Sequence, residues 1–184
     1  MAQKIEIQVI EDKLLLEGVL DEKLVKENDL SRINGEFNLV ELTPTVQSLS
    51  LSFKRIGRIE NLVGFDNLIK LCLDNNFIED ISNISHLVNL KWLDLSFNKI
   101  KKIQGFDTLT QLEDLSLYSN KISSIEGLEK CTNLQCLSLG NNRIDSLDQI
   151  VRFRQLKSLR MLTLSDNPIS NNNVDYRNYV MAYV

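Results

Sequence analysis

The sequence is poor in the residues that carry most catalytic and metal-binding chemistry. Its 184 residues include one histidine, His86, and three cysteines. No cluster of histidine, cysteine or carboxylate residues has the spacing of a metal site, and no glycine-rich phosphate loop follows a predicted strand. We therefore predict that the protein is not an enzyme and that it needs no cofactor or metal. His86 is interpreted as an ordinary surface residue.

Long apolar runs are also lacking. No run can span a bilayer, and the polar segment 1–8 has no signal-peptide centre. The cysteines are odd in number and suit a reducing compartment as unpaired thiols. We expect an intracellular protein. A net charge of −4 and a pI near 5.1 argue against nucleic acid as the main partner.

What the chain does contain is a repeat of 22 residues. Asparagine returns at this period within one apolar frame, Leu-x-x-Leu-x-Leu-x-x-Asn-x-Ile-x-x-Ile/Leu. A first copy starts at Val46, with Lys54 in the asparagine place, and a sixth copy follows a longer fifth repeat. This pattern is typical of a leucine-rich repeat. Because one such unit cannot bury its own apolar side, we predict a single α/β solenoid of six stacked repeats.

The frame assigns each residue type to a side of this solenoid. Leu71 and Leu73 alternate with polar residues, which predicts a short strand in a parallel concave sheet with the leucines inward. The apolar spacing of three that follows predicts short 3₁₀ or helical turns on the convex side. The asparagines can satisfy the backbone of the bend between them, because an amide both donates and accepts hydrogen bonds. We interpret them as a structural ladder comprising Asn76, Asn98, Asn120, Asn142 and Asn167.

Both ends of a solenoid need a cover, and non-repeat residues are expected to supply it. Residues 1–45 are predicted to be a capping segment, and residues 46–184 the repeat domain. An amphipathic helix is expected between Asp12 and about Asn28 or Asp29, with the apolar residues Leu16, Val19, Leu20 and Leu24. The tail after Asn171 has an apolar, aromatic face made of Val174, Tyr176, Tyr179, Val180 and Tyr183. Its abrupt end leads us to expect a truncated C-terminal cap and a longer natural protein.

The outward residues of the concave sheet are mostly small and polar, so its large side chains form a candidate protein-binding surface. This surface consists of Trp92, Tyr118, Asp74, Asp94, Asp114, Phe53, Phe97 and Met161. The alternative for Trp92 is a cross-strand pair with Lys70 and Asp114. Asp94 and Asp114 could also be imagined as an acid and base pair, but their positions predict an open face without a pocket.

A second candidate surface lies in the long fifth repeat. Four basic residues within nine positions of its convex segment could contact phosphate or an acidic partner, although a solvated face is the more common meaning of such a cluster. The residues are Arg152, Arg154, Lys157 and Arg160.

Several segments carry a resemblance to known families. The 22-residue frame resembles the subfamily typified by the nuclear regulatory subunit of protein phosphatase 1, which includes an outer-arm dynein light chain and a spliceosomal A-prime protein. More specific segments make the chain, from about residue 46 to 184, similar to the axonemal family of dynein regulatory complex subunit 3. They are Trp92-Leu-Asp-Leu-Ser-Phe-Asn98, Leu112-Glu-Asp-Leu-Ser-Leu117, Leu137-Ser-Leu-Gly-Asn-Asn-Arg-Ile-Asp145 and Leu162-Thr-Leu-Ser-Asp-Asn-Pro-Ile-Ser170.

The resemblance implies a noncatalytic scaffold of the nexin-dynein regulatory complex, which regulates dynein-driven motility in cilia and flagella. It implies an axonemal, cytoskeletal location in the cytoplasm. The implied partners are other subunits of the complex or an inner-arm dynein, and a coiled coil is expected to follow the repeats in the full-length protein. We expect the domain itself to be monomeric and to bind neither nucleic acid nor membrane. Two alternatives are a regulatory subunit that binds a protein phosphatase and a ribonucleoprotein adaptor.

Overall fold

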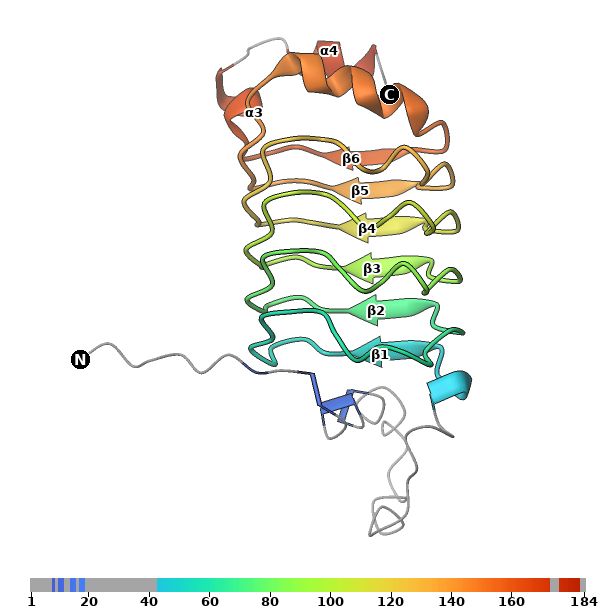
Figure 1. The fold of residues 1–184 in the computed structure, drawn as a ribbon. Helices are drawn as coiled ribbons and strands as arrows, with labels where there is room; N and C mark the ends of the chain where they lie inside the picture. The colour runs from blue at the N-terminus through green and yellow to red at the C-terminus, as the bar shows by residue number, and fades with distance from the viewer. Residues whose placement is uncertain are drawn as a thin grey trace, which may run out of the picture.

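A single parallel sheet organises the molecule. The computed structural model describes residues 43–172 and 176–182, together with Gln8, Ile10, Glu11, Leu14, Leu15, Glu17 and Gly18. Six strands lie side by side in sequence order (Figure 1). They are β1 (Ser48–Ser50), β2 (Lys70–Cys72), β3 (Trp92–Asp94), β4 (Asp114–Ser116), β5 (Cys136–Ser138) and β6 (Met161–Thr163). The predicted solenoid with a six-stranded parallel sheet is thereby confirmed.

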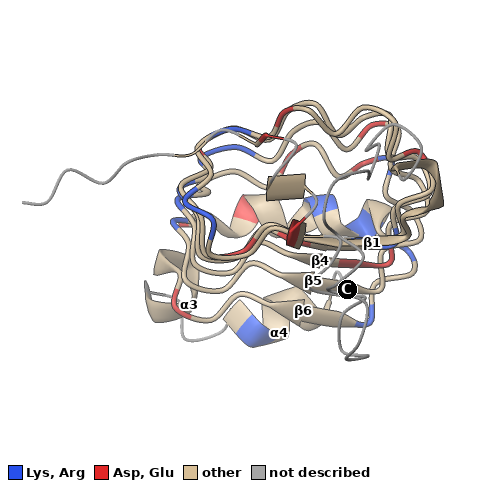
Figure 2. Cartoon of the chain, turned by 90° about the horizontal axis from the view of Figure 1, so that it is seen from below, with Lys and Arg blue, Asp and Glu red and all other residues tan. Residues whose placement is uncertain are grey.

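The register of the sheet aligns the repeats residue for residue. Leu71 pairs with Leu93, and Leu93 pairs with Leu115, so one leucine column runs through the stack. These central leucines are fully buried. Their neighbours on the other side of the sheet are half-buried in β3 and β4, whereas in β2 Lys70 is exposed and Cys72 is buried. Viewed along the stack, the strands lie on one side of the molecule and the return segments on the other (Figure 2). The core fills the space between them.

The return side consists mostly of single turns. In the second repeat, the backbone N–H groups of Leu87 and Leu90 donate to the carbonyls three residues earlier, which is the 3₁₀ pattern that the apolar spacing predicts. A longer 3₁₀ helix occurs only in the fifth repeat among the described returns, as η3 (Leu147–Gln155). Ser146 caps it by accepting a hydrogen bond of 3.3 Å from the N–H of Asp148.

A left-handed backbone position recurs at the same place in four returns. It is occupied by Asn61, Asn83, Gly105 and Gly127, all with positive φ. Asparagine and glycine tolerate this conformation best. At Gly127 the close packing of repeats adds a second requirement, because a Cβ atom would lie 2.4 Å from the carbonyl oxygen of Ile103. Asparagine or glycine at this position of the return is therefore part of the 22-residue repeat pattern.

The buried asparagines form a continuous hydrogen-bonded ladder. Asn98 shows the pattern: its Oδ1 accepts from the N–H of Ile78 at 2.9 Å, and its Nδ2 donates to the carbonyls of Leu73 at 2.9 Å and Leu95 at 3.1 Å. Each asparagine thus ties its own bend to the preceding repeat. The first repeat lacks this amide, and the ammonium group of Lys54 instead pairs with Glu17 at 3.2 Å.

The N-terminal segment covers the β1 end of the core. Gln8 forms a parallel bridge to Ile56, while Ile10, Leu14 and Leu15 are buried in the core. The backbone is helical at Leu14, Leu15, Glu17 and Gly18. Gly18 lies so close to β1 that a Cβ atom would be 2.4 Å from the carbonyl oxygen of Ser50. The predicted face of Leu16, Val19, Leu20 and Leu24, and the proposed ends of that helix, lie outside the described residues.

Three further short helices lie in the described part of the chain. They are η2 (Thr43–Thr45) before β1, and α3 (Pro168–Asn172) and α4 (Tyr176–Met181) after β6. Tyr176, Tyr179 and Val180 are partly buried and pack against the core, so the expected apolar face of the tail does cover this end. Val174 and Tyr183 lie outside the described residues. None of the described helices is long and apolar enough to cross a membrane. The domain boundary near residue 45 stays a prediction.

Candidate protein-docking surface

The side chains that project from the sheet away from the core form one continuous surface, here called the open face. Three rows of residues make it up, because strand residues alternate between the two sides of a sheet. The register places Lys70, Trp92 and Asp114 in one row, so they are direct cross-strand neighbours. Most of the remaining positions carry serine, threonine or cysteine.

Three aspartates cross the open face on a diagonal, one on each of three successive repeats. Asp74 follows β2 and accepts hydrogen bonds from the hydroxyl of Ser52 and from the Nδ2 of Asn75, the latter at 2.7 Å. Asp94 on β3 accepts from the N–H of Ser96 at 2.8 Å and from its hydroxyl at 2.5 Å. These bonds fix the carboxylates in place. A carboxylate has about four acceptor positions, so each retains capacity for a donor from outside.

Asp114, the third of these aspartates, has a raised pKa. Burial is the largest cause, and the negative charge of Asp94 adds to it, while a hydrogen bond from the Cys136 thiol acts in the opposite direction. A cation placed beside Asp114 would favour the charged form of its carboxyl group. Among the described residues, no group of three metal-ligating side chains is placed to hold a metal ion. A basic side chain would also supply a positive charge to these carboxylates.

Trp92 is already engaged within the fold. The ammonium of Lys70 lies 4.9 Å from the centroid of its ring, and the indole is half-buried. This contact is the cross-strand alternative that the sequence left open for Trp92. A cation over an aromatic face contributes about 0.5–1 kcal/mol at an exposed site. Trp92 therefore contributes to the stability of the sheet, independently of any partner.

The aromatic residues at the carboxyl ends of the strands are less engaged. Phe53 is 72% exposed and Phe97 is 50% exposed. The Phe97 ring packs edge-on against Tyr118, with ring centroids 5.5 Å apart and an interplanar angle of 65°. Tyr118 in turn covers Gly140, where a Cβ atom would lie 2.9 Å from the tyrosine ring. We call Phe53, Phe97 and Tyr118 the aromatic edge of the open face.

Backbone geometry makes the two phenylalanines unusual. Phe53 and Phe97 have φ angles of 58° and 53°, in the left-handed region. The equivalent position immediately before the ladder residue is also left-handed in the other repeats, where it is occupied by Asn75, Ser119, Asn141 and Asp166. Small polar residues, asparagine and aspartate above all, tolerate this conformation better than a bulky aromatic residue. Phenylalanine at this position is therefore both strained and exposed, and neither property helps the fold.

Met161 does not belong to the same cluster. It is 62% exposed, but it lies on β6, at the opposite end of the sheet from Phe53. The four basic residues are also divided. Arg152 and Arg154 lie on η3, where Arg152 pairs with Glu126 at 3.2 Å, whereas Arg160 immediately precedes β6. Lys157 is exposed between η3 and β6.

His86 has a more specific role than that of an ordinary surface residue. It is half-buried, and its Nε2 lies 2.8 Å from the carbonyl oxygen of Leu62. This contact joins the return of the second repeat to that of the first. The sequence contained no signal for it, since the position is not occupied by histidine in the other repeats. The contact indicates a structural function.

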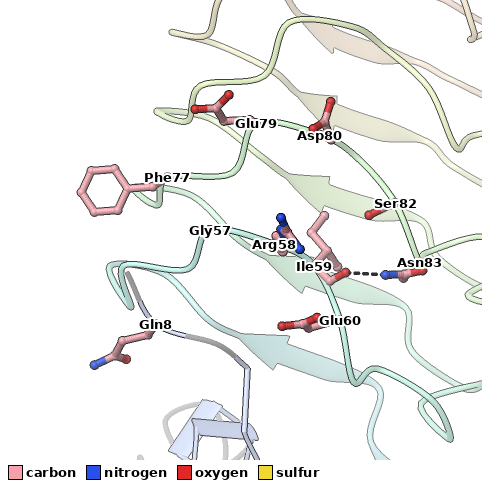
Figure 3. Close-up of a pocket in the computed structure, with 10 residues that line it drawn as sticks. All are labelled: Gln8, Gly57, Arg58, Ile59, Glu60, Phe77, Glu79, Asp80, Ser82 and Asn83. Carbon is pink, nitrogen blue, oxygen red and sulfur yellow. Dashed lines mark hydrogen bonds between the residues drawn. The ribbon is translucent and has the colours of Figure 1, made fainter. Parts of the chain in front are cut away.

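A hollow of about 700 Å³ lies on the return side of the first two repeats, against Gln8 (Figure 3). Its wall includes Arg58, Glu60, Phe77 and Glu79. Glu79 is held by Lys101 at 2.7 Å, and the contact lowers the pKa of the carboxyl group. The hollow is open and its charged groups face solvent, so it lacks the enclosure of an active site. It was not anticipated from the sequence, because the cap residue that borders it has no periodic signal.

Residues 76–184 match a family described as leucine-rich repeat, and they are more than half of the chain. The chain therefore belongs to the leucine-rich repeat family. Leucine-rich-repeat proteins are typically interaction modules without enzymatic activity, and they present an extended surface to protein partners. No curated protein matches the chain.

Solved structures show the same fold in bacterial proteins. An internalin, InlF, from Listeria monocytogenes is 27% identical with a TM-score of 0.71, and the match covers 92% of this chain and 47% of that one. Internalin C2 from the same organism is 26% identical with a TM-score of 0.62, over 92% and 80% of the two chains. A leucine-rich-repeat protein of Leptospira interrogans is 29% identical with a TM-score of 0.57, over 61% and 29%. The chain thus spans about half the length of the InlF structure.

Proposed function

We propose that this chain is a noncatalytic docking domain that binds another protein with the aromatic edge and the aspartates of its open face. The observation that carries the proposal is the pair Phe53 and Phe97. Each exposes apolar surface to water at a backbone position that costs roughly 1–3 kcal/mol for a non-glycine residue. Exposed aromatic residues with a polar surround are the usual energetic centre of a protein interface.

The cellular setting that we propose is the axoneme. The support is the resemblance of the segments around Trp92, Leu112, Leu137 and Leu162 to the family of dynein regulatory complex subunit 3. On this proposal the domain is a scaffold of the nexin-dynein regulatory complex and binds another subunit of the complex or an inner-arm dynein. Its effect on motility follows from holding that partner in place, since the open face carries no enclosed site for chemistry.

The test uses the tagged full-length protein and detergent-stripped axonemes that lack the endogenous subunit. Wild-type protein is expected to sediment with the axonemes. The double variant Phe53→Asn with Phe97→Asn should fold normally. Its affinity for the axonemes should be at least about 30-fold lower, since losing a hot-spot aromatic costs about 2 kcal/mol or more. The matched control is Val63→Asn with Val88→Asn, which removes two exposed apolar side chains from the return side.

Two results would contradict the proposal. If wild-type protein does not associate with stripped axonemes, the axonemal setting is wrong. If the phenylalanine variant rebinds like the valine control, with folding verified by circular dichroism, the open face is not the docking surface. The basic residues Arg152, Arg154, Lys157 and Arg160 would then be the next surface to replace.

A further inference from the structure

The spacing of the two exposed phenylalanines identifies the shape of the partner. Phe53 and Phe97 occupy the same position in the first and third repeats. Parallel strands stack at about 4.8 Å, so two steps separate the phenylalanine backbones by roughly 10 Å along the stack. A helix rises about 1.5 Å per residue, and residues seven apart on one face are separated by about 10.5 Å. The two spacings agree within about 1 Å.

An extended partner fits this spacing poorly. Side chains on one face of a strand repeat about every 6.8 Å, and the next interval is about 13.6 Å. Neither matches the separation of roughly 10 Å between the two positions. A helix that lies along the stack can therefore contact both phenylalanines with two apolar side chains, whereas a strand in the same direction can contact only one.

The second repeat lies between these two contacts and presents a negative charge. Asp74 is in that repeat, next to the left-handed position that Asn75 occupies there. Its carboxylate is held by Ser52 and Asn75 and is half-buried. Asp94 on the third repeat lies beside it on the diagonal. A helix residue midway between positions i and i+7 is i+3 or i+4, and it projects from the same face. A lysine or arginine there would meet Asp74.

We propose that the open face binds an amphipathic helix of a partner protein, an inference that rests on the proposed docking function. This helix carries apolar residues at i and i+7, which contact Phe53 and Phe97. It carries a basic residue at i+3 or i+4, which pairs with Asp74. The apolar pair provides most of the affinity, and the charge fixes the register, because a helix shifted by one residue loses both contacts.

The probe is a synthetic alanine-based peptide of about 18 residues with leucines seven positions apart and lysines midway between them. A second peptide replaces the lysines with glutamine, and a third moves one leucine to the opposite helix face. Binding to the full chain is measured by fluorescence anisotropy at low salt. The first peptide should bind more tightly than the second by about fivefold. It should bind more tightly than the third by about 30-fold.

Protein variants assign these contacts. Phe53→Asn should lower the affinity for the first peptide by roughly 30-fold. Asp74→Asn should remove the difference between the lysine and glutamine peptides, whereas the exposed control Asp107→Asn should leave that difference intact. A higher salt concentration should lower the affinity of the lysine peptide and leave the affinity of the glutamine peptide unchanged.

The inference is overturned if the first peptide does not bind, if the displaced leucine makes no difference, or if Asp74→Asn preserves the lysine preference. These outcomes are distinguishable from failure of the docking function. If the peptides show no preference but the phenylalanine double variant still loses axonemal binding, the open face is a docking surface for a partner of another shape.

Discussion

Two neighbouring rows of residues run through this molecule and differ in what explains them. One row is the asparagine ladder, which is buried and makes the same hydrogen bonds in successive repeats. The other row lies one residue earlier in each repeat and is left-handed throughout, with Phe53 and Phe97 among asparagine, serine and aspartate. The fold explains the first row completely. It does not explain Phe53 in the second row, and it explains Phe97 only in part, through the Tyr118 ring contact, which is why we place the proposed function there.

The largest effect on stability is expected at the inward leucines of the sheet, beside the ladder. Leu93→Ala should lower the free energy of unfolding by about 2–5 kcal/mol, because Leu93 is fully buried and its neighbours fill the resulting cavity only in part. The neighbouring change Trp92→Ala should cost only about 0.5–1 kcal/mol through the lost Lys70 contact. Urea unfolding of both variants measures the difference. Equal losses would show that the two sides of the sheet are not distinct.

The ladder comes next in expected effect. Asn98→Ala should cost about 1–3 kcal/mol, because the N–H of Ile78 and the carbonyls of Leu73 and Leu95 lose their partner. Asn98→Asp retains the acceptor but removes the donor, so thermal unfolding should place it near the alanine variant. An unchanged melting temperature in both would mean that water replaces the amide without cost.

The row before the ladder should respond in the opposite direction. Phe53→Asn should raise stability by about 1 kcal/mol, because asparagine tolerates the left-handed backbone. Phe97→Asn should be nearly neutral, since relief of the same strain is offset by loss of the Tyr118 ring contact, worth about 0.5–1.5 kcal/mol. Thermal unfolding of the two variants tests this order. Destabilisation by Phe53→Asn would remove the argument that phenylalanine is retained for binding.

The smallest effect is expected at Asp114. Its folded pKa is raised above the ordinary value of 3.8, so the protonated form contributes stability that is fully present below that pH. This contribution is lost as pH rises through the folded pKa. Asp114→Asn should therefore melt slightly higher than wild type at pH 7 and equally at pH below 3.8. A pH series of melting curves, with Asp107→Asn as control, measures it. An advantage that persists at low pH would contradict the electrostatic cause.

Much of the fold and part of the site were predictable from the sequence. Residues 22 apart are neighbours in the stack, so the frame alone predicts the pairing of Leu71 with Leu93 and the alignment of Lys70 with Trp92 and Asp114. The same frame predicts which side chains leave the core: it places Tyr118 on the outward side, with Phe53 and Phe97 one position further along, near the strand ends. It did not predict that Ile10, Leu14 and Leu15 enter the core, because the cap does not repeat.

The tertiary structure alone decided which outward residues are free for a partner. Whether Trp92 is engaged by Lys70, how far Phe53 and Phe97 are exposed and that their backbone is left-handed all depend on coordinates rather than period. The sequence by itself determined the solenoid, because burial of a repeated apolar frame has one regular solution. The proposed docking surface consists of residues that depart from that repeat, and a repeat pattern does not determine what such residues contact.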